Sequence, residues 1–522
     1  MAHTKSILTF VLLSLLVCAF ADRRQSQRRL SDAQQCRMNR ISGIRPTRVI
    51  RSEGGITELW DEDRDEFQCA GVAATRNTLN PNSLYLPSFS SAPQIVYIER
   101  GPFVSHSSLY IYIYIFSLET CPKKSKQANI ASLFLTGRGI IGLSAPGCSE
   151  SFHSGESGSI QHRKIRGQGF RDQHQKVQRI ERGDVIAIPP GITHWCYNDD
   201  NSEELVAFTV TDVTSDYNQL DTKQRQFFIA GGQPRGQRKQ GEGERGQKGR
   251  QEGEYGEEEQ RGEQGKEKLI QTILPQIDTR FLAEALDIPI ELAQKIQRED
   301  ERGIIIKVEK EGLRILSPEG EEREEERERE TGPRANVIGV GERYCNAKIR
   351  QNIESLREAD IYSRHGGHLK TINRRNLPIL DILDMSAAKV TLYSDAILAP
   401  HWSINAHTIA YITRGEGQIQ IIGTNGQKVM DDRVRQGDVI IVPQFFTSMC
   451  KAGSQGIEWI AIKTSDLPMN SPLVGYTSAI KGMPIEVLTN AYRISNQQAQ
   501  DIKYNREDQI MIFPSSSRSA SS

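Results

Sequence analysis

The sequence has no excess of charge of either sign. Its 522 residues include 66 basic and 66 acidic side chains, so the net charge at pH 7 is zero. Proteins that bind nucleic acid or an anionic membrane surface usually show a basic excess or a basic face. The Arg-rich runs of this chain are interleaved with Glu, which is typical of solvated segments. We therefore expect neither nucleic acid nor a membrane as a partner.

Long hydrophobic runs are absent after the first 21 residues. The chain is only 37% hydrophobic, and its mean hydropathy is −0.51. Its one apolar run, Ile7 to Phe20, is too short to cross a bilayer. The run follows Lys5 and ends at the small residues Ala19 and Ala21, which is the pattern of a secretory signal peptide. We predict a signal peptide at 1–21 and passage through an oxidising compartment.

Cysteine is sparse, and no two cysteines have the Cys-x-x-Cys spacing. This absence makes a structural zinc site a poor interpretation, whereas an oxidising compartment favours disulfides. The spacing alone does not decide which cysteines pair. Apart from Cys18 in the signal peptide, the candidates are Cys36, Cys69, Cys121, Cys148, Cys196, Cys345 and Cys450.

Common catalytic motifs are also missing. The sequence contains no Gly-x-Ser-x-Gly, no P-loop and no His-Glu-x-x-His. These motifs place a nucleophile, a phosphate or a catalytic zinc, so their absence removes several large classes of enzyme. We expect no catalytic residues and no cofactor.

What the sequence does contain is an internal repeat. Residues 183–191 (GDVIAIPPG) return as residues 437–445 (GDVIIVPQF), and each copy lies downstream of an Arg-Gly pair, at 100–101 and at 414–415. Matching landmarks in the same order indicate a duplicated unit. Short apolar runs separated by Gly, Pro, Asn and Ser are typical of antiparallel strands closed into a barrel or jelly roll. The predicted fold class is mainly β, with two barrel domains that are each followed by a short helical segment.

Composition divides the chain into seven segments. Stretches made almost wholly of Gly, Gln, Glu, Arg and Lys cannot bury enough apolar surface to offset chain entropy. Helix starts are predicted at Asp278 or Thr279, and at Ser495, where Gln498 completes a capping-box spacing. The expected segments are a signal peptide (1–21), an N-terminal barrel (22–233), a disordered linker (234–266), a helical extension (267–317), a charged loop (318–344), a C-terminal barrel with a helical extension (345–510) and a disordered tail (511–522).

Residues 102–137 form an anomalous insert. Joining residue 101 directly to residue 138 gives a continuous pattern like that around residues 414–419 of the second unit. We predict that the flanking strands are hairpin neighbours. The insert contains a Tyr/Ile alternation at 110–115 that a repeated TATATA nucleotide sequence would encode. A genuine long loop and an intervening sequence retained in the gene both remain open.

The first copy of the repeat extends into a longer motif, Gly183-x5-Pro189-x-Gly191-x2-His194-x3-Asn198. This motif resembles the second motif of the cupin superfamily, whose small β-barrels often hold a metal ion. In such cupins two histidines and a carboxylate before the Arg-Gly turn complete the ligand set. The resemblance therefore implies a bicupin.

The expected metal positions are degenerate in both units. Counting back from the Arg-Gly turns gives Pro87, Phe89 and Gln94 in the first unit, and His401, Ser403 and Thr408 in the second, with Ser448 as the last position. Each barrel keeps one imidazole, and one imidazole does not hold a transition metal. We predict that His194 and His401 are structural and that no metal is bound.

Almost the whole chain resembles the legumin-type (11S) seed storage globulins, and cereal glutelins and triticins look most similar. The insert is the exception. The stretches that carry the resemblance are residues 54–56 (GGI), 92–98 (APQIVYI), 146–152 (PGCSESF), 281–285 (FLAEA), 399–402 (APHW) and 471–477 (SPLVGYT).

The resemblance implies a nutrient reservoir. It implies assembly with copies of this chain or with other 11S subunits, as trimers and then hexamers. It also implies transport through the endoplasmic reticulum to the protein storage vacuole, cleavage by a processing endopeptidase, and proteolysis on germination. The family's disulfides transfer to Cys36–Cys69 and Cys148–Cys345, which leaves Cys196 and Cys450 free and Cys121 in the insert.

The sequence departs from the family at the processing site. Legumins are cut at an Asn-Gly bond seven residues before the inter-chain cysteine, and here that position holds Ile338-Gly339. The nearest asparagine is Asn336, which is followed by Val337. Cleavage is therefore expected to be slow or shifted to the Asn336–Val337 bond.

Two other functions stay open as alternatives. A metal-dependent cupin oxidase or isomerase would require a bound metal. A carbohydrate-, hormone- or other small-ligand-binding cupin would require a ligand in one of the barrels.

Overall fold

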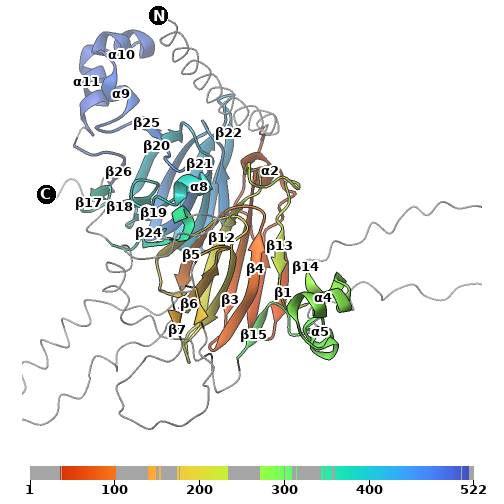
Figure 1. The fold of residues 1–522 in the computed structure, drawn as a ribbon. Helices are drawn as coiled ribbons and strands as arrows, with labels where there is room; N and C mark the ends of the chain where they lie inside the picture. Colours follow the sequence, from red (N-terminus) through yellow and green to blue (C-terminus); the bar gives the residue numbers. More distant parts are fainter. Residues whose placement is uncertain are drawn as a thin grey trace, which may run out of the picture.

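The protein is described from a computed structural model (Figure 1). The described residues are 36, 38–100, 139–148, 152–153, 173–175, 177–232, 271–298, 300–308, 313, 342–345, 347–355, 359–506 and 508–515. The predicted signal peptide, the insert, the linker at 234–266 and the processing residues 336–339 lie outside them.

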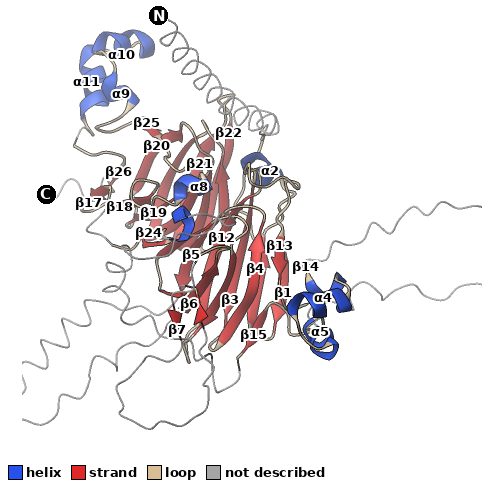
Figure 2. Ribbon diagram, viewed as in Figure 1, coloured by secondary structure: helices blue, strands red, loops and turns tan. Residues whose placement is uncertain are grey.

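Two sheets build the N-terminal barrel (Figure 2). The first has the order β1 (Arg48–Ser52), β2 (Gly55–Leu59), β3 (Val72–Leu79), β12 (Leu205–Asp212), β5 (Gln94–Arg100), β10 (Asp184–Ile188) and β16 (Arg350–Asn352). The second has the order β14 (Gln271–Thr272), β13 (Gln226–Phe228), β4 (Ser83–Ser90), β11 (Thr193–Asn198), β6 (Gly139–Ser144) and β9 (Val177–Ile180), with β15 (Ile305–Lys307) also paired to β4. A separate pair joins β7 (Phe152–His153) to β8 (Gln173–His174). Apart from the parallel β13–β14 pair, all these pairings are antiparallel.

The C-terminal barrel repeats this plan with longer strands. Its sheet contains β17 (Ile361–Ser363), β18 (Gly367–Ile372), β19 (Ser386–Leu392), β24 (Thr447–Lys463), β20 (Ile397–Ser403) and β25 (Asn470–Pro472). The remaining strands are β21 (Thr408–Ile422), β22 (Lys428–Arg435), β23 (Val439–Val442) and β26 (Ile512–Phe513). The predicted fold class, mainly β with two barrels, is confirmed.

The hairpin predicted around the insert is wrong. β5 pairs with β10 and β12, whereas β6 pairs with β9 and β11 in the other sheet. In the C-terminal barrel the matching residues form the single strand β21, which changes register at Gly415. Gly415 has φ +74°, and a Cβ there would lie 2.1 Å from the Gly456 carbonyl oxygen. In the C-terminal barrel the Arg-Gly pair therefore marks a bend within one long strand. In the N-terminal barrel the described strands β5 and β6, before and after the insert, belong to different sheets.

Each barrel is completed by an arm from the other half of the chain. Ile44 bridges Val439 of β23, and Ile41 donates its backbone N–H to the Val429 carbonyl. Reciprocally, β16 pairs with β10 of the N-terminal barrel. The expected boundaries at 22 and 345 are therefore wrong for these arms, because each arm covers an open strand edge of the opposite barrel.

Aromatic and charged side chains join the barrels across a shared core. Phe208 and Tyr411 stack with ring centroids 4.2 Å apart. The Tyr411 hydroxyl donates to Glu99 Oε2 at 2.8 Å, and Arg76 donates to the same oxygen at 3.0 Å. Because Phe208 and Tyr411 are almost fully buried, the two barrels share this interior.

Two groups of helices, α9 to α11 and α4 with α5, lie at opposite ends of the molecule, whereas α2 and α8 lie between them (Figure 2). The Asp278 side chain accepts hydrogen bonds from the first turn of α4, and Ser495 and Gln498 form a capping box at α11. Residues 511–513 contradict the predicted disordered tail, because β26 pairs with β20 and its side chains are buried. The helices are α2 (Asp65–Ala70), η2 (Leu274–Gln276), α4 (Thr279–Leu286), α5 (Ile290–Ile296), α7 (Glu342–Cys345), α8 (Leu380–Leu383), α9 (Ala479–Gly482), α10 (Ile485–Tyr492) and α11 (Asn496–Tyr504).

Candidate functional site

The repeated Gly-Asp motif forms a structural turn in each barrel. Gly183 has φ +86° and Gly437 has φ +87°, a backbone conformation that favours glycine. The following carboxylates accept backbone N–H groups three residues upstream, at 2.9 Å for Asp184 and 2.8 Å for Asp438. The repeat that revealed the duplication therefore fixes a backbone turn in both copies.

The same two carboxylates hold the exchanged arms. Asp184 forms an ion pair with Arg350 at 2.9 Å, and Asp438 forms one with Arg45. The sequence analysis did not find these two arginines. A motif search within one unit cannot show them, because each comes from the opposite half of the chain.

Pairing corrects the count of the former metal positions in the N-terminal barrel. His194 lies opposite Ser88, as Ser448 lies opposite His401 in the other barrel. The two former histidine positions are therefore Ser88 and Ser90. The count from the sequence, which gave Pro87 and Phe89, was one residue too low. Neither serine restores the imidazole that a metal ion would need.

An amide network occupies these positions in the N-terminal barrel. Gln94 Nε2 donates to Thr211 Oγ1 and to Gln226 Oε1, both at 3.1 Å. Gln226 Nε2 donates in turn to Ser88 Oγ at 2.7 Å. The side chains at the expected ligand positions therefore bond to one another through neutral groups.

A lysine ammonium occupies the corresponding positions in the C-terminal barrel. Lys463 Nζ donates to Ser403 Oγ at 3.0 Å, to Thr408 Oγ1 at 3.2 Å and to Asn470 Oδ1 at 3.0 Å. Ser403 and Thr408 are two of the expected metal positions, so the ammonium holds the positive charge that a metal ion would otherwise supply. Burial lowers the pKa of Lys463 to about 8.

The sequence analysis missed Lys463. Its one signal was its position directly after the apolar run 459–462. The strand pairings show that Lys463 is equivalent to Thr211 of the N-terminal barrel. Only this equivalence shows that Lys463 faces the former metal positions.

The two retained histidines are neutral near physiological pH. Burial lowers the pKa of His194 to about 4, against a smaller opposing effect of the Ile192 carbonyl. Burial also lowers the pKa of His401 to about 4, the nearby Lys463 ammonium acts in the same direction, and the Ala399 carbonyl opposes both. His401 Nδ1 lies 2.9 Å from that carbonyl oxygen, whereas His194 Nδ1 has no hydrogen-bond partner in the described structure.

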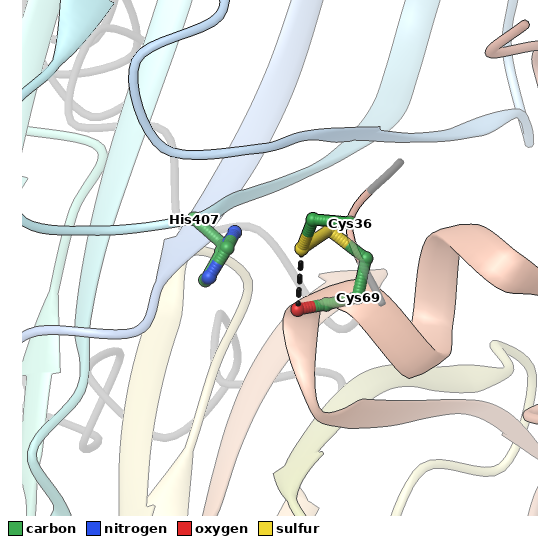
Figure 3. Close-up of side chains that lie close together, drawn as sticks. All are labelled: Cys36, Cys69 and His407. Carbon is green, nitrogen blue, oxygen red and sulfur yellow. Dashed lines mark hydrogen bonds between the residues drawn. A yellow bond between two sulfur atoms is a disulfide. The ribbon is translucent and has the colours of Figure 1, made fainter. Parts of the chain in front are cut away.

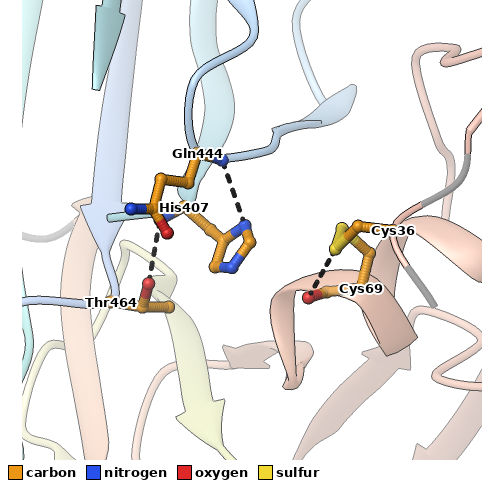
Figure 4. Close-up of a disulfide and its surroundings, with 5 residues drawn as sticks. All are labelled: Cys36, Cys69, His407, Gln444 and Thr464. Atoms are coloured by element: carbon orange, nitrogen blue, oxygen red, sulfur yellow. Dashed lines mark hydrogen bonds between the residues drawn. A yellow bond between two sulfur atoms is a disulfide. The ribbon is translucent and has the colours of Figure 1, made fainter. Parts of the chain in front are cut away.

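Among the described residues, one cluster of three potential metal ligands is found, Cys36, Cys69 and His407 (Figure 3). The two sulfurs form a disulfide with a Cα–Cα distance of 4.7 Å, so neither is available as a thiolate. The Gln444 backbone N–H donates to His407 Nδ1 at 3.3 Å, and the His407 backbone N–H donates to Thr464 Oγ1 (Figure 4). These residues do not fit a metal ion while the disulfide is intact.

The second disulfide joins Cys148 to Cys345, with a Cα–Cα distance of 5.3 Å. Cys196 and Cys450 are free, and burial raises the pKa of each thiol to about 12. A thiol with so high a pKa is a poor nucleophile.

The N-terminal barrel encloses a cavity of about 140 Å³. Its wall is mainly aliphatic, and residues on it include Val96, Ile98, Ile141, Ile186 and Leu205. His194, Gln94 and Gln226 also line it. The cavity therefore combines an aliphatic wall with neutral polar groups, and the charged residues Arg48, Glu62, Lys223 and Arg225 also line it.

Comparison with known proteins identifies this arrangement. The family described as Cupin matches residues 43–104, 122–235 and 353–500. The 11S globulin seed storage protein 2 of Sesamum indicum is 41% identical over 527 aligned positions, which cover 99% of this chain and 100% of that protein. Glutelin type-A 1 of Oryza sativa subsp. japonica is 34% identical over 94% of this chain and 89% of its own length.

A solved structure agrees with these sequence matches. The 11S globulin from Wrightia tinctoria, described as revealing an auxin binding site, has a TM-score of 0.70 and 32% identity. The match covers 92% of this chain and 96% of that one.

The fold and its two degenerate centres define a bicupin without a metal site in the part of the chain that the structure describes. Within that class, the chain belongs to the 11S seed storage globulins. It is a seed storage protein and not an enzyme.

No helix among the described residues is both long enough and apolar enough to span a membrane.

Proposed function

We propose that the chain stores nitrogen as a closed ring of subunits that pairs into hexamers in the protein storage vacuole. The observation that carries this proposal is a pair of exposed apolar helical surfaces at opposite ends of the molecule (Figure 1). One surface is on η2, α4 and α5 and the segments beside them: Ile273, Ile277, Phe281, Leu286, Ile290, Leu292 and Ile296. The other is on α10 and α11: Val487, Tyr492, Ile502 and Tyr504.

Two different surfaces on one chain favour head-to-tail assembly. A contact of this kind closes into a ring when the rotation between subunits allows it. Clusters of exposed apolar side chains are typical of protein interfaces. The helical extensions would therefore hold neighbouring subunits together.

Phe281→Glu is expected to break the ring into monomers. Phe281 is 71% exposed on α4, so a charge there leaves the isolated subunit folded but prevents burial of the surface between subunits. Light scattering after size exclusion should show the subunit mass. The control is Leu220→Glu, which changes a residue that is 63% exposed outside the helices and should leave the assembly intact. An assembled Phe281→Glu protein would contradict the proposed interface.

Processing is proposed at the Asn336–Val337 bond. An asparaginyl endopeptidase needs asparagine on the acyl side of the bond, and Asn336 is the one asparagine between residues 309 and 345. The Cys148–Cys345 bridge would keep the two products linked after the cut.

Amino-terminal sequencing of the smaller chain from seed should therefore begin at Val337. A start at Gly339 would show that a protease of different specificity acts at the family's usual position. An uncut chain would show that the altered sequence blocks processing.

Small-molecule carriage is a second candidate function. The Wrightia tinctoria relative is described as having an auxin binding site. The cavity of about 140 Å³ in the N-terminal barrel is the observation that favours a ligand in this chain. A chain that binds no small organic molecule in solution would remove this candidate without affecting the storage role.

A further inference from the structure

The two barrels differ at an inward-facing position that lines the cavity in one of them. Gln94 and Thr408 hold the same former metal position, so Tyr97 and Tyr411, three residues further on, are equivalent. Phe208 pairs with Tyr97, and Ile460 pairs with Tyr411. Ala207 of β12, one residue before Phe208, therefore corresponds to Trp459 of β24. Trp459 is buried in the core of the C-terminal barrel, whereas Ala207 lines the cavity of the N-terminal barrel.

A second inward-facing position of the same strand also differs between the barrels. Thr211 in the N-terminal barrel corresponds to Lys463, whose long side chain crosses the interior of the C-terminal barrel to Ser403 and Thr408. Small residues thus replace large ones at two inward-facing positions of the same strand. Of these two positions, Ala207 lies on the cavity wall.

The size of the cavity limits its occupant. At about 140 Å³ it is close to an engineered apolar cavity of about 150 Å³ that stays dry and binds benzene. The aliphatic wall suits an apolar body of about the size of one aromatic ring.

One histidine lines the cavity among the aliphatic side chains. His194 is 7% exposed, and its ring belongs to the cavity wall. The imidazole is neutral at pH 7, so the inner part of the cavity favours a neutral group.

The basic residues that line the cavity are exposed or partly exposed, so they lie on its solvent-facing, outer part. Arg48 is exposed, and Lys223 and Arg225 are partly exposed. Two carboxylates face these cations. Burial raises the pKa of Glu62, and Asp221 pairs with Arg225 at 2.6 Å. The outer part of the cavity therefore carries a positive balance that favours a negatively charged group.

We propose that the N-terminal barrel binds a small organic acid, with its apolar ring or chain against the aliphatic wall and its carboxylate at Arg48. This inference rests on small-molecule carriage as the second candidate function. It adds the barrel, the position of the ligand and the chemical class.

Phenylacetate is the probe, and phenylacetamide is its neutral match. Calorimetry on the full-length chain should show phenylacetate binding at least threefold more tightly than phenylacetamide, because only the acid has the charge that Arg48 attracts. Arg48→Gln should remove this difference and leave phenylacetamide binding unchanged. Equal affinities of the two probes for the unmodified chain would overturn the assigned role of Arg48 and the acid class.

Ala207→Trp tests the site itself by transferring the residue of the C-terminal barrel. It should weaken phenylacetate binding at least tenfold, while the thermal unfolding midpoint shows that the variant is folded. Tyr362→Trp, at a position that is 63% exposed on β17, is the matched control and should bind normally. If Ala207→Trp does not fold, Ala207→Leu makes a smaller filling change with the same expected loss.

The outcomes separate the two levels of the proposal. Binding that survives both Ala207 variants would place the ligand elsewhere, which overturns this inference and keeps small-molecule carriage. An unmodified chain that binds neither probe overturns the inference at this site, and a wider panel of organic acids then decides the candidate function.

Discussion

Acidification from pH 6.5 to pH 4 is expected to lower the free energy of unfolding by about 3 kcal/mol for each of His194 and His401. The folded chain holds both imidazoles with a pKa of about 4, below the ordinary value of 6.5. Between these values the unfolded chain binds the protons and the folded chain does not. The contribution is therefore complete above pH 6.5 and is lost as the pH falls through 4. Denaturant unfolding at pH 7, 5.5 and 4 measures it.

Substitution separates the histidines from the carboxylates that titrate in the same range. The double variant His194→Asn, His401→Asn should lose most of the pH dependence between 6.5 and 4.5, because asparagine does not titrate. His365→Asn, which changes an exposed histidine of the C-terminal domain, is the matched control. A double variant with the slope of the unmodified chain would show that neither imidazole is held neutral by the barrels.

Cys148→Ser is expected to destabilise the chain by about 5 kcal/mol, the second large effect. The bridge to Cys345 closes a loop with a sequence separation of 197 residues, and a cross-link over such a loop removes much conformational freedom from the unfolded chain. Denaturant unfolding without reductant measures the difference. Cys196→Ser is the control, because Cys196 is free and its loss leaves both disulfides in place.

The same variant tests the link between the processed halves. After cleavage at the Asn336–Val337 bond, the unmodified chain should run as one species on a non-reducing gel and as two after reduction. Cleaved Cys148→Ser should run as two species under both conditions. A linked species in that variant would mean that a different pair of cysteines joins the halves.

The duplicated fold could be predicted from the sequence because its signals are local. Short apolar runs between turn residues specify strands, and a Gly-Asp turn repeats because each barrel needs the same backbone conformation at Gly183 and Gly437. The helix N-caps at Asp278 and Ser495 could also be predicted from the sequence, because a capping residue and the backbone groups it bonds lie within a few residues of each other.

The hairpin predicted around the insert was wrong because the local sequence pattern does not determine which strands pair. An Arg-Gly pair between two apolar runs is compatible with a tight turn and with a bend inside one long strand. In β21 the bend is decided by β24, which pairs with residues on both sides of Gly415. That partner lies more than 30 residues further along the chain, so the pattern around the glycine does not contain the answer.

The sequence by itself determined that this protein is a duplicated β-barrel chain whose metal positions are degenerate, because those features depend on residue types at short, fixed spacings. Only the tertiary structure decided that the arms are exchanged, that Lys463 occupies the former metal positions and that the N-terminal barrel contains a cavity. Each of these depends on strands that meet across long sequence separations, as when Arg350 reaches Asp184 and when Ala207 takes the place that Trp459 fills in the other barrel. Packing sets such contacts, and the volume left between side chains follows from the assembled strands.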